Sequence, residues 1–479
     1  MNDDLYRIMI QGGVTSPGEL KETIALLESL GLDTVSLGSR QDLLFSAPGE
    51  GVAEDNLTSG REIVRDRRYQ NIVTSYVSSD IFDSTHWLKG STYLYLIEQF
   101  DYLPRLKVNI TDPLQRLVPG LNGNLNFLAS PHEDYWYLNI RLPHWERGEY
   151  FPVLVYSWDI TSLCRYVENL EEPPENAESL FEDLHSNLEL NSRSMERPPE
   201  IPYKTFPYYE GVNRMGFDKY WLGLYWRNNL YDLPFLKELC GFCLDNSIGK
   251  ICITPWKSLI IKGIYESARP ALERMLGQRG INVRHSQLEM NWHLPVADPG
   301  ALQLKNYLVG VFHERDISTY GLTFGISNDV GKRTHFAAII IEKNPVPGTA
   351  SGALFRPSYN ILYSKNFDPN SCRYIPFAQD VGREVLPDLL IELSRMYFGQ
   401  QDQEEPKARQ PRPDAGEFNL RHVYQCPSCL TIYDPVSGDP DSGIAPGTPF
   451  EELPANHSCT VCSADGSIFQ PLELSITEK

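Results

Sequence analysis

Four cysteines near the end of the chain form the pattern with the clearest chemistry. They come as two CxxC pairs joined by a longer loop, one at Cys426 and Cys429 and the other at Cys459 and Cys462. Four thiolates brought together in this way make a tetrahedral all-sulfur site that suits iron or zinc. Each pair can hold one edge of the tetrahedron, while backbone amides in the turns donate hydrogen bonds to sulfur and tune the metal. The pattern predicts a metal site and leaves the choice of metal open.

The segment between the two pairs has the composition of a turn-rich loop whose shape depends on a bound metal. Prolines and glycines recur through it, at Pro435, Gly438, Pro440, Gly443, Pro446, Gly447, Pro449 and Pro454. Together with the cysteine pairs, this loop makes the region of about residues 421–475 resemble rubredoxin. The resemblance implies one iron ion, held by the four cysteines, that carries a single electron between ferric and ferrous states. A structural zinc ribbon is the alternative.

The chain departs from the usual rubredoxin pattern beside each cysteine pair. Glycine is expected directly after each pair, and Leu430 and Ser463 stand there instead. An aromatic residue, a tryptophan and a proline of the family are replaced by Thr431, His457 and Thr460. We expect these changes to leave the metal site intact and to alter its potential, its access to solvent or its partner.

Charge and composition limit what the chain can bind. Its 479 residues carry a net charge of −20, which disfavours nucleic acid because the phosphates would be repelled. The sequence has no apolar run of about eighteen residues and no secretory signal at its acidic start, so we expect a cytoplasmic protein without membrane contact. Residues 421–479 hold eight acidic residues against two basic ones, a net of −6. These charges would steer a basic redox partner protein to this surface, or they serve solubility alone.

The long segment that precedes the cysteine pairs begins with a predicted helix and a predicted hairpin. Ser16, Pro17 and Glu19 have the spacing of a capping box with proline in the first turn, which predicts a helix start. Apolar residues follow at helical spacing, and residues 34–37 and 43–45 have the pattern of two hairpin strands.

This unit is repeated later in the chain. Residues 20–45 can be laid on 236–261 without a gap, and the same offset lays 106–111 on 322–327. A constant offset over separated segments predicts two related halves.

The duplicated unit resembles the ferredoxin-like half domains of siroheme-dependent nitrite and sulfite reductases over about residues 5–390. In that family an arginine of the hairpin turn contacts the anionic tetrapyrrole, and Arg40 matches it here. We therefore expect an α+β fold, a duplicated nitrite/sulfite reductase-like body with a small C-terminal rubredoxin-like metal-binding domain. The expected segments are a first half at 1–170, a connecting segment at 171–200, a second half at 201–399, a flexible linker at 400–420 and the rubredoxin-like domain at 421–479.

The body lacks ligands that the resemblance would require. Those reductases hold a four-iron cluster, bridged to siroheme, with two cysteine pairs in the later part of the second half. After Cys252 the body contains only Cys372, so we expect no four-iron cluster. The CxxC of Cys240 and Cys243 falls on the core side of a helix, which favours buried structural thiols over a metal or redox pair.

Several basic residues of the body could form a site for an anion. Arginines cluster early in the chain and further cations could contribute from the second half, at Arg61, Arg65, Arg67, Arg68, Lys257, Lys262 and Arg284. A solvated basic surface is the interpretation that we favour over an anion site. The sequence therefore assigns no catalytic and no cofactor-binding residue to the body.

These patterns favour a one-electron transfer protein. The rubredoxin iron would serve a nitrite or sulfite reductase system, with such a reductase or its electron donor as partner and the body as docking scaffold. The alternative is a siroheme-binding nitrite/sulfite reductase-type oxidoreductase that lacks the four-iron cluster and is fed by its own rubredoxin domain, although the sequence disfavours siroheme. A structural or regulatory protein with zinc in the tail is a third hypothesis. Whether the chain is an enzyme stays open, and an electron carrier or oxidoreductase component is favoured over a stand-alone enzyme.

Overall fold

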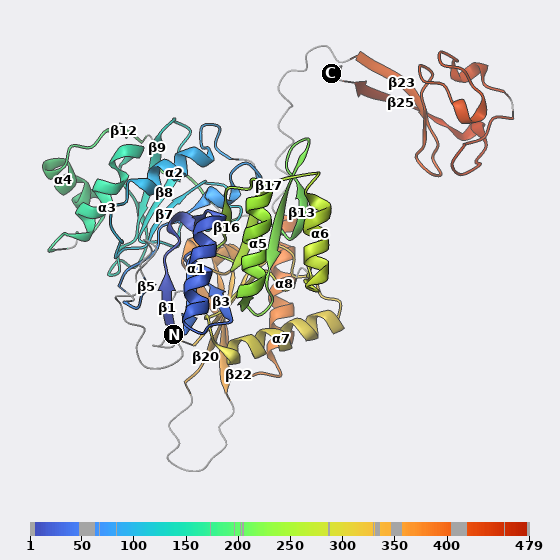
Figure 1. The fold of residues 1–479 in the computed structure, drawn as a ribbon. Helices are drawn as coiled ribbons and strands as arrows, with labels where there is room; N and C mark the ends of the chain where they lie inside the picture. Colours follow the sequence, from blue (N-terminus) through green and yellow to red (C-terminus); the bar gives the residue numbers. More distant parts are fainter. Residues whose placement is uncertain are drawn as a thin grey trace. The chain divides into compact units, whose positions relative to one another are not determined.

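The computed structural model divides the chain into two units, Met1–Gln401 and Asp402–Lys479. It describes residues 5–46, 63–345, 357–403 and 419–476, apart from 67, 83, 173, 196, 202, 204–205, 286–287, 329, 331–335 and 455. Helices and sheets are mixed throughout the first unit, as predicted (Figure 1). Arg61 and Arg67 of the basic cluster, and 404–418 of the expected linker, lie outside the described residues.

The first helix and hairpin form as the sequence predicts. Helix α1 spans Pro17–Ser29, and Ser16 and Glu19 complete a capping box at its start, each accepting from the other's backbone N–H. Strands β3 (Thr34–Leu37) and β4 (Leu43–Ser46) pair antiparallel. The sheet continues through β1 (Leu5–Ile8) to β5 (Ile63–Val64).

The second half repeats this unit at the predicted offset. Helix α5 spans Leu233–Asp245, and both of its ends match those of α1 at that offset. Strand β19 (Phe324–Ser327) matches β7 (Val108–Thr111) at the same offset. The hairpin sheet of this half contains β13 (Gly211–Arg214), β14 (Lys219–Tyr225), β17 (Ser258–Tyr265) and β16 (Ile251–Ile253) in that order.

The two halves exchange short strands. The residues directly before α1 form β2 (Val14–Thr15), which pairs with β16 of the second half. The residues directly before α5 form β15 (Tyr231–Asp232), which pairs with β3 of the first half. Helices α1 and α5 pack side by side over a core to which both hairpin sheets contribute (Figure 1). Each half therefore completes the sheet of the other.

Each half also carries a larger sheet with the same strand pattern. Three neighbouring strands run parallel and the next one antiparallel, in the orders β6-β7-β8-β9 and β18-β19-β20-β21. The remaining strands are β6 (Val73–Thr74), β8 (Leu125–Ala129), β9 (Tyr135–Ile140), β10 (Glu149–Tyr150), β11 (Val153–Tyr156), β12 (Ser192–Ser194), β18 (Trp292–His293), β20 (Ile339–Lys343), β21 (Ser358–Ser364) and β22 (Tyr374–Gly382).

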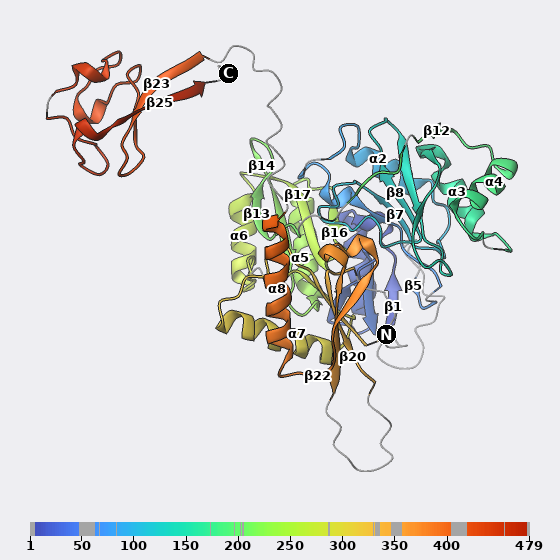
Figure 2. The same ribbon diagram turned by 180° about the vertical axis from the view of Figure 1, so that it is seen from behind.

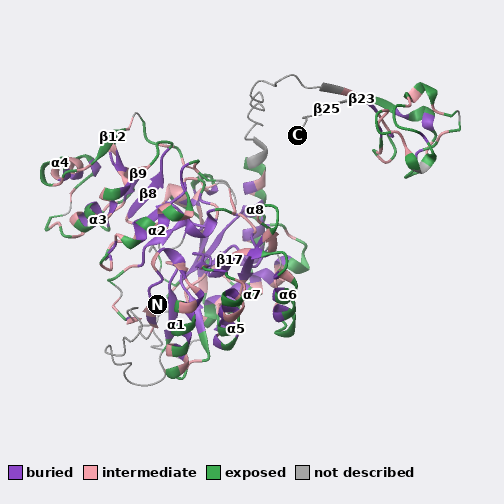
Figure 3. Ribbon diagram, turned by 45° about the horizontal axis from the view of Figure 1, so that its top comes forward, coloured by how far each residue is buried: buried purple, intermediate pink, exposed green. Residues whose placement is uncertain are grey.

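Helices cover these sheets and bury them. The first core includes residues of α2 (Gly90–Glu98), α3 (Ile160–Glu168) and α4 (Ala177–Asn187). In the second half, α7 (Pro299–Glu314) and α8 (Leu386–Gln403) pack on β19 to β21 (Figure 2), while α6 (Arg269–Gln278) joins the core of α1 and α5. Strands β8, β9 and β17 are accordingly largely buried (Figure 3).

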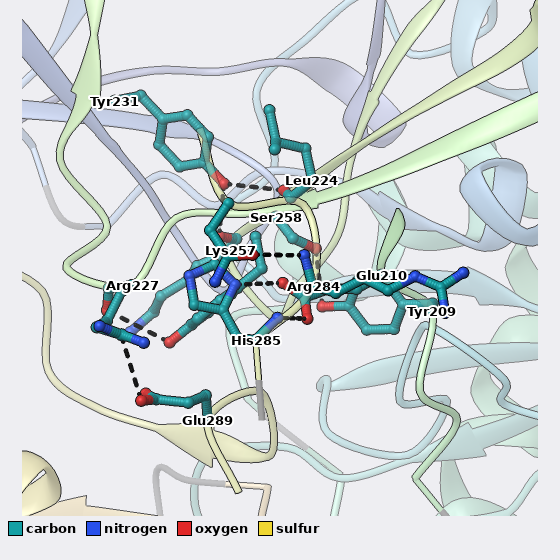
Figure 4. Close-up of polar contacts among 12 residues, drawn as sticks. Tyr209, Glu210, Leu224, Arg227, Tyr231, Lys257, Ser258, Arg284, His285 and Glu289 are labelled. Atoms are coloured by element: carbon teal, nitrogen blue, oxygen red, sulfur yellow. Dashed lines mark hydrogen bonds and ion pairs between the residues drawn. The ribbon is translucent and has the colours of Figure 1, made fainter. Parts of the chain in front are cut away.

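A network of charged groups lies inside the second half. The ammonium of Lys305 on α7 has no exposed surface and lies 2.7 Å from a carboxylate oxygen of Glu289, and Arg227 approaches the same carboxylate at 3.2 Å. Close by, Nδ1 of His285 lies 2.6 Å from Glu210 (Figure 4). Burial lowers the pKa of Lys305, but Tyr225 and Glu289 raise it by more, so the ammonium stays charged at neutral pH.

The second unit is a small sheet with a compact core. Strand β23 (Asn419–Gln425) pairs antiparallel with β25 (Gln470–Ile476) and with β24 (Ile432–Tyr433). Its core contains two of the four paired cysteines and aromatic side chains. Among the residues that the structure describes, no helix of either unit is both long and apolar enough to cross a membrane.

Candidate metal centre

The structure brings the four predicted cysteines together at one end of the small sheet. Their sulfur atoms all lie within 4.8 Å of one another. Two of the separations are 3.4 Å between Cys429 and Cys459 and 3.6 Å between Cys426 and Cys462. A tetrahedral site with metal–sulfur bonds of about 2.3 Å has sulfur–sulfur edges of about 3.8 Å. The four thiols therefore fit a single metal ion, and they can hold one iron as rubredoxin does.

The two ligand loops have the same backbone design. In the first, the Cys426 N–H donates to the Thr431 carbonyl and the Leu430 N–H donates to the Cys426 carbonyl, both at 2.8 Å. In the second, the Cys459 N–H donates to the Ala464 carbonyl and the Ser463 N–H to the Cys459 carbonyl, again at 2.8 Å. Each turn requires a positive φ at the residue after its second cysteine. This value is 63° at Leu430 and 58° at Ser463, which explains why glycine is expected at both positions.

We expect Ser463→Gly to stabilise the second unit by about 1 kcal/mol. A side chain in left-handed backbone costs about 1–2 kcal/mol that glycine does not incur, although glycine gains entropy in the unfolded chain. Urea unfolding followed by the absorption of the metal–thiolate site measures this. A Ser463→Gly variant less stable than the natural chain would show that the left-handed backbone at Ser463 is not strained.

Backbone and side-chain donors prepare the sulfur atoms for a metal. Burial raises the pKa of Cys426, but the amides of Cys429 and Ser428 lower it by more. The Thr431 hydroxyl, 3.1 Å from the Cys429 sulfur, and the Thr431 amide together lower the pKa of Cys429. Burial also raises the pKa of Cys459, but amides of its loop lower it by more. At Cys462 the Ala464 amide lowers the pKa, but the other three cysteines raise it by more, to about 12. Three of the four sulfurs thus favour the thiolate, which is the form that binds metal.

The hydroxyl of Thr431 gives this chain an extra hydrogen bond to a ligand sulfur. Thr431→Val should lower the reduction potential by about 20–40 mV, because a hydrogen bond to sulfur favours the more negative ferrous site by roughly 0.5–1 kcal/mol. A spectroelectrochemical titration of the full chain checks this. Thr460→Val, a substitution in the other loop, is the matched control, and an equal shift in both variants would refute the assignment to Thr431.

An aromatic shell supports the site. The Tyr424 and Phe450 rings stack with centroids 3.9 Å apart. His457, which stands where the family has tryptophan, is half-buried between Tyr433 and Phe469, with centroid distances of 6.1 and 6.2 Å. The histidine therefore fills part of the aromatic core.

A small antiparallel sheet that ends in two CxxC loops around one tetrahedral all-sulfur position defines a mononuclear metal–thiolate module. The family pattern of rubredoxin matches residues 423–469. Through this segment the chain belongs to the rubredoxin family. The rubredoxin module and its four cysteines indicate electron transfer.

Known rubredoxin proteins match a short part of this chain. The probable rubredoxin of Methanothermobacter thermautotrophicus is 46% identical over 57 residues, which are 12% of this chain and 90% of that protein. The high molecular weight rubredoxin of Moorella thermoacetica is 51% identical over 49 residues, or 10% of this chain and 21% of that one. Anaerobic nitric oxide reductase flavorubredoxin of Escherichia coli is 46% identical over 48 residues, 10% of each chain. The chain thus spans about a fifth or less of the two longer relatives.

The body has the fold that the sequence analysis predicts. The solved structure of the Mycobacterium tuberculosis NirA protein superposes with a TM-score of 0.64 at 14% identity, covering 84% of this chain and 82% of that one. At this identity the likeness shows the fold. The predicted architecture, a body of mixed helices and sheets with the NirA fold and a C-terminal rubredoxin domain, is confirmed.

Several of the cations that could bind an anion instead donate hydrogen bonds within the body. Arg40 donates to the carbonyls of Asn71 and Val108 and to the Asn109 side chain. Lys257 donates to the Leu294 carbonyl.

The other cations of this set lie elsewhere. Lys262 donates to carbonyls of Tyr76 and Ser79. Arg65, Arg68 and Arg284 are exposed, and Arg68 pairs with Asp66. Among the residues that the structure describes, these cations therefore make separate contacts and share no common partner.

Sequence reasoning missed two basic residues, Lys107, which lies near Arg40, and Arg141, which lies near Lys107. Lys107 and Arg141 flank Asn124 across the edge of β7, β8 and β9, and burial lowers the pKa of Lys107 to about 8, helped by the charges of Arg40 and Arg141. The Arg141 guanidinium also donates to the Cys372 sulfur at 2.9 Å. The sequence feature that could have revealed Lys107 and Arg141 is the alternation of polar and apolar residues along these strands.

The CxxC of Cys240 and Cys243 lies on the core side of a helix, as predicted. Cys240 and Cys243 are buried on α5, and burial raises the pKa of each thiol to about 12. Thiols of this kind are poor ligands and poor nucleophiles at neutral pH.

Proposed function

We propose that the chain is a one-electron carrier whose iron is held by Cys426, Cys429, Cys459 and Cys462. The observation that carries this is the convergence of four thiols, in two amide-rich loops, at tetrahedral spacing. A bound iron would supply the ferric–ferrous couple. The protein holds all four ligands in rigid turns, so that little has to rearrange when an electron arrives or leaves.

We further propose that the carrier works in the cytoplasm in a nitrite or sulfite reductase system, with the body as docking scaffold. One support is the likeness of the body to the NirA fold. The other is that Arg40 and Lys257, which could have contacted an anion, donate hydrogen bonds to backbone carbonyls of the body. A partner that contains the missing cofactor, either a reductase or its electron donor, would complete the system. The chain would then be an oxidoreductase component with no reductase activity of its own.

An absorption spectrum with metal analysis tests the carrier. The full chain, expressed in a host that makes siroheme, should contain one iron, show ferric–thiolate bands and bleach with dithionite. It should not reduce nitrite or sulfite unaided. Zinc in a colourless preparation would refute the proposal.

The cations around Arg40 favour a second candidate function, siroheme binding by the body. Burial and the charges of Arg40 and Arg141 lower the pKa of Lys107. The carboxylates of an anionic tetrapyrrole would offset these three positive charges. Tetrapyrrole bands in the purified chain that vanish in Arg141→Gln, and persist in the surface control Arg68→Gln, would establish it. A preparation without such bands from the siroheme-making host would exclude it.

A further inference from the structure

A cavity of about 890 Å³ lies in the body, along α3 and beside the C-terminal ends of α2 and α4 (Figure 1). Two aromatic rings line it, with Tyr95 38% exposed and Trp158 61% exposed. Their centroids are 5.3 Å apart and their planes are tilted by 54°. The volume matches that of pockets that hold small organic ligands. Aromatic faces that stay exposed in such a cavity are suited to stacking on a planar ring.

The position of Trp158 is fixed by its neighbour in the chain. Ser157, in the same short turn, is 2% exposed. Its hydroxyl accepts from the indole N–H of Trp136 at 2.9 Å and donates to the Asp134 carbonyl at 3.1 Å. This buried anchor holds the backbone of the turn, so the indole of Trp158 is presented to water at the wall of the cavity. A large aromatic side chain held in water in this way favours a role in binding.

The wall of the cavity also contains polar groups without partners. In the part of the chain that the structure describes, Nε2 of Gln99 and Oγ1 of Thr161 make no hydrogen bond, although neither atom is exposed to water. Such atoms are rare, because an unmade hydrogen bond is costly. Both side chains are half-buried, so a small rotation turns either group toward the cavity. Both groups can donate, and a ligand that satisfies them therefore carries acceptor oxygens on its edge.

The charges at the cavity disfavour a phosphorylated ligand. The charged residues that line it are Asp101, Glu171 and Arg165, two carboxylates against one guanidinium. Arg165 is paired with Asp101 and lies over the Tyr102 ring, 4.6 Å from its centroid. Its charge is thus already compensated, and a phosphate would meet a wall with surplus negative charge. A neutral ligand fits this wall better.

We propose that the cavity binds a neutral planar ring with carbonyl oxygens on its edge, the chemistry shared by quinones and by the isoalloxazine ring of flavins. The ring stacks on Trp158 and Tyr95, and its carbonyl oxygens accept hydrogen bonds from Gln99 and Thr161. All four residues lie in the first unit, so binding does not depend on the metal of the second.

Isothermal titration calorimetry of the air-oxidised full chain tests the site with three probes. Duroquinone, which is fully substituted and does not add thiols, and lumiflavin represent the two sources of the ring. Durene has the shape of duroquinone without its carbonyls. We expect at least one of the two carbonyl probes to bind once per chain. Durene should bind about tenfold more weakly than duroquinone, because it leaves both donors without a partner.

Two variants assign the contacts. Trp158→Ala should weaken binding of the carbonyl probes about tenfold, because stacking on the indole is lost. Thr161→Val keeps the shape of the side chain and should weaken the carbonyl probes about threefold while leaving durene unchanged. Circular dichroism checks that both variants are folded. Phe217→Ala is the matched control, since this ring is 96% exposed in the turn between β13 and β14 and does not line the cavity.

Each outcome has a definite meaning. Binding of duroquinone alone or of lumiflavin alone supports the site and identifies the source of the ring. The proposal is overturned if neither probe binds, if durene binds as tightly as duroquinone, or if Trp158→Ala keeps the natural affinity. It is also overturned if Phe217→Ala loses as much affinity as Trp158→Ala, or if flavin mononucleotide, which adds a phosphate, binds more tightly than lumiflavin.

Discussion

Replacing Cys459 by serine should abolish metal binding and unfold the second unit while the body stays folded. Cys459 is a buried ligand, only 2% exposed, so a water molecule has little room to replace its sulfur. Metal binding by small thiolate sites is worth about 10–16 kcal/mol, and this binding energy is also folding energy. We expect less than a tenth of the natural metal content by elemental analysis. Limited proteolysis should cut the second unit rapidly and leave a stable body.

The matched control for this prediction is Cys372→Ser. This thiol is half-buried in the first unit and accepts a hydrogen bond from Arg141 instead of facing the other paired cysteines. It should retain one metal per chain. A Cys459→Ser chain that kept its metal and its protease resistance would show that three thiolates suffice to fold the unit.

Replacing Lys305 by methionine should destabilise the body by about 3–5 kcal/mol, because removing one partner of a buried pair leaves an uncompensated charge in a poorly polarisable interior. The substitution keeps the volume of the side chain but leaves the carboxylate of Glu289, itself 8% exposed, without its closest cation. Urea unfolding of the body, followed by circular dichroism, measures the loss.

The chain offers a close control for the effect of burial. Lys237 and Glu28 form an ion pair of the same length, 2.7 Å, but their side chains are 46% and 33% exposed. Lys237→Met should change the stability by no more than about 0.5 kcal/mol, because water solvates the charge that remains. Equal losses in the two variants would mean that the distance between the charges matters and their burial does not.

Local patterns explain why much of the fold and the metal centre could be predicted. The cysteine ligands lie in closely spaced pairs, so each pair is positioned by its own turn. The capping box at Ser16 fixes the start of α1, and the constant offset between the halves then places both ends of α5. None of these features depends on contacts with remote parts of the chain.

The interior of the body could not be predicted in the same way. Arg40 looks like a ligand contact in the sequence, yet its two terminal nitrogens donate to residues far along the chain, such as Asn71 and Asn109, while its buried Nε has no hydrogen-bond partner among the described residues. Lys107 and Arg141 become neighbours only because β7, β8 and β9 are paired. Which charges meet is decided by tertiary structure, which spacing along the chain does not reveal.

The exchange of β2 and β15 between the halves has a consequence for synthesis on the ribosome. The first hairpin sheet needs β15 (Tyr231–Asp232) as its edge strand beside β3 (Thr34–Leu37). At about 5–20 residues per second, translation of the intervening stretch takes roughly 10–40 s. Until then one edge of the nascent sheet is unpaired, which exposes the growing chain to pairing with other strands.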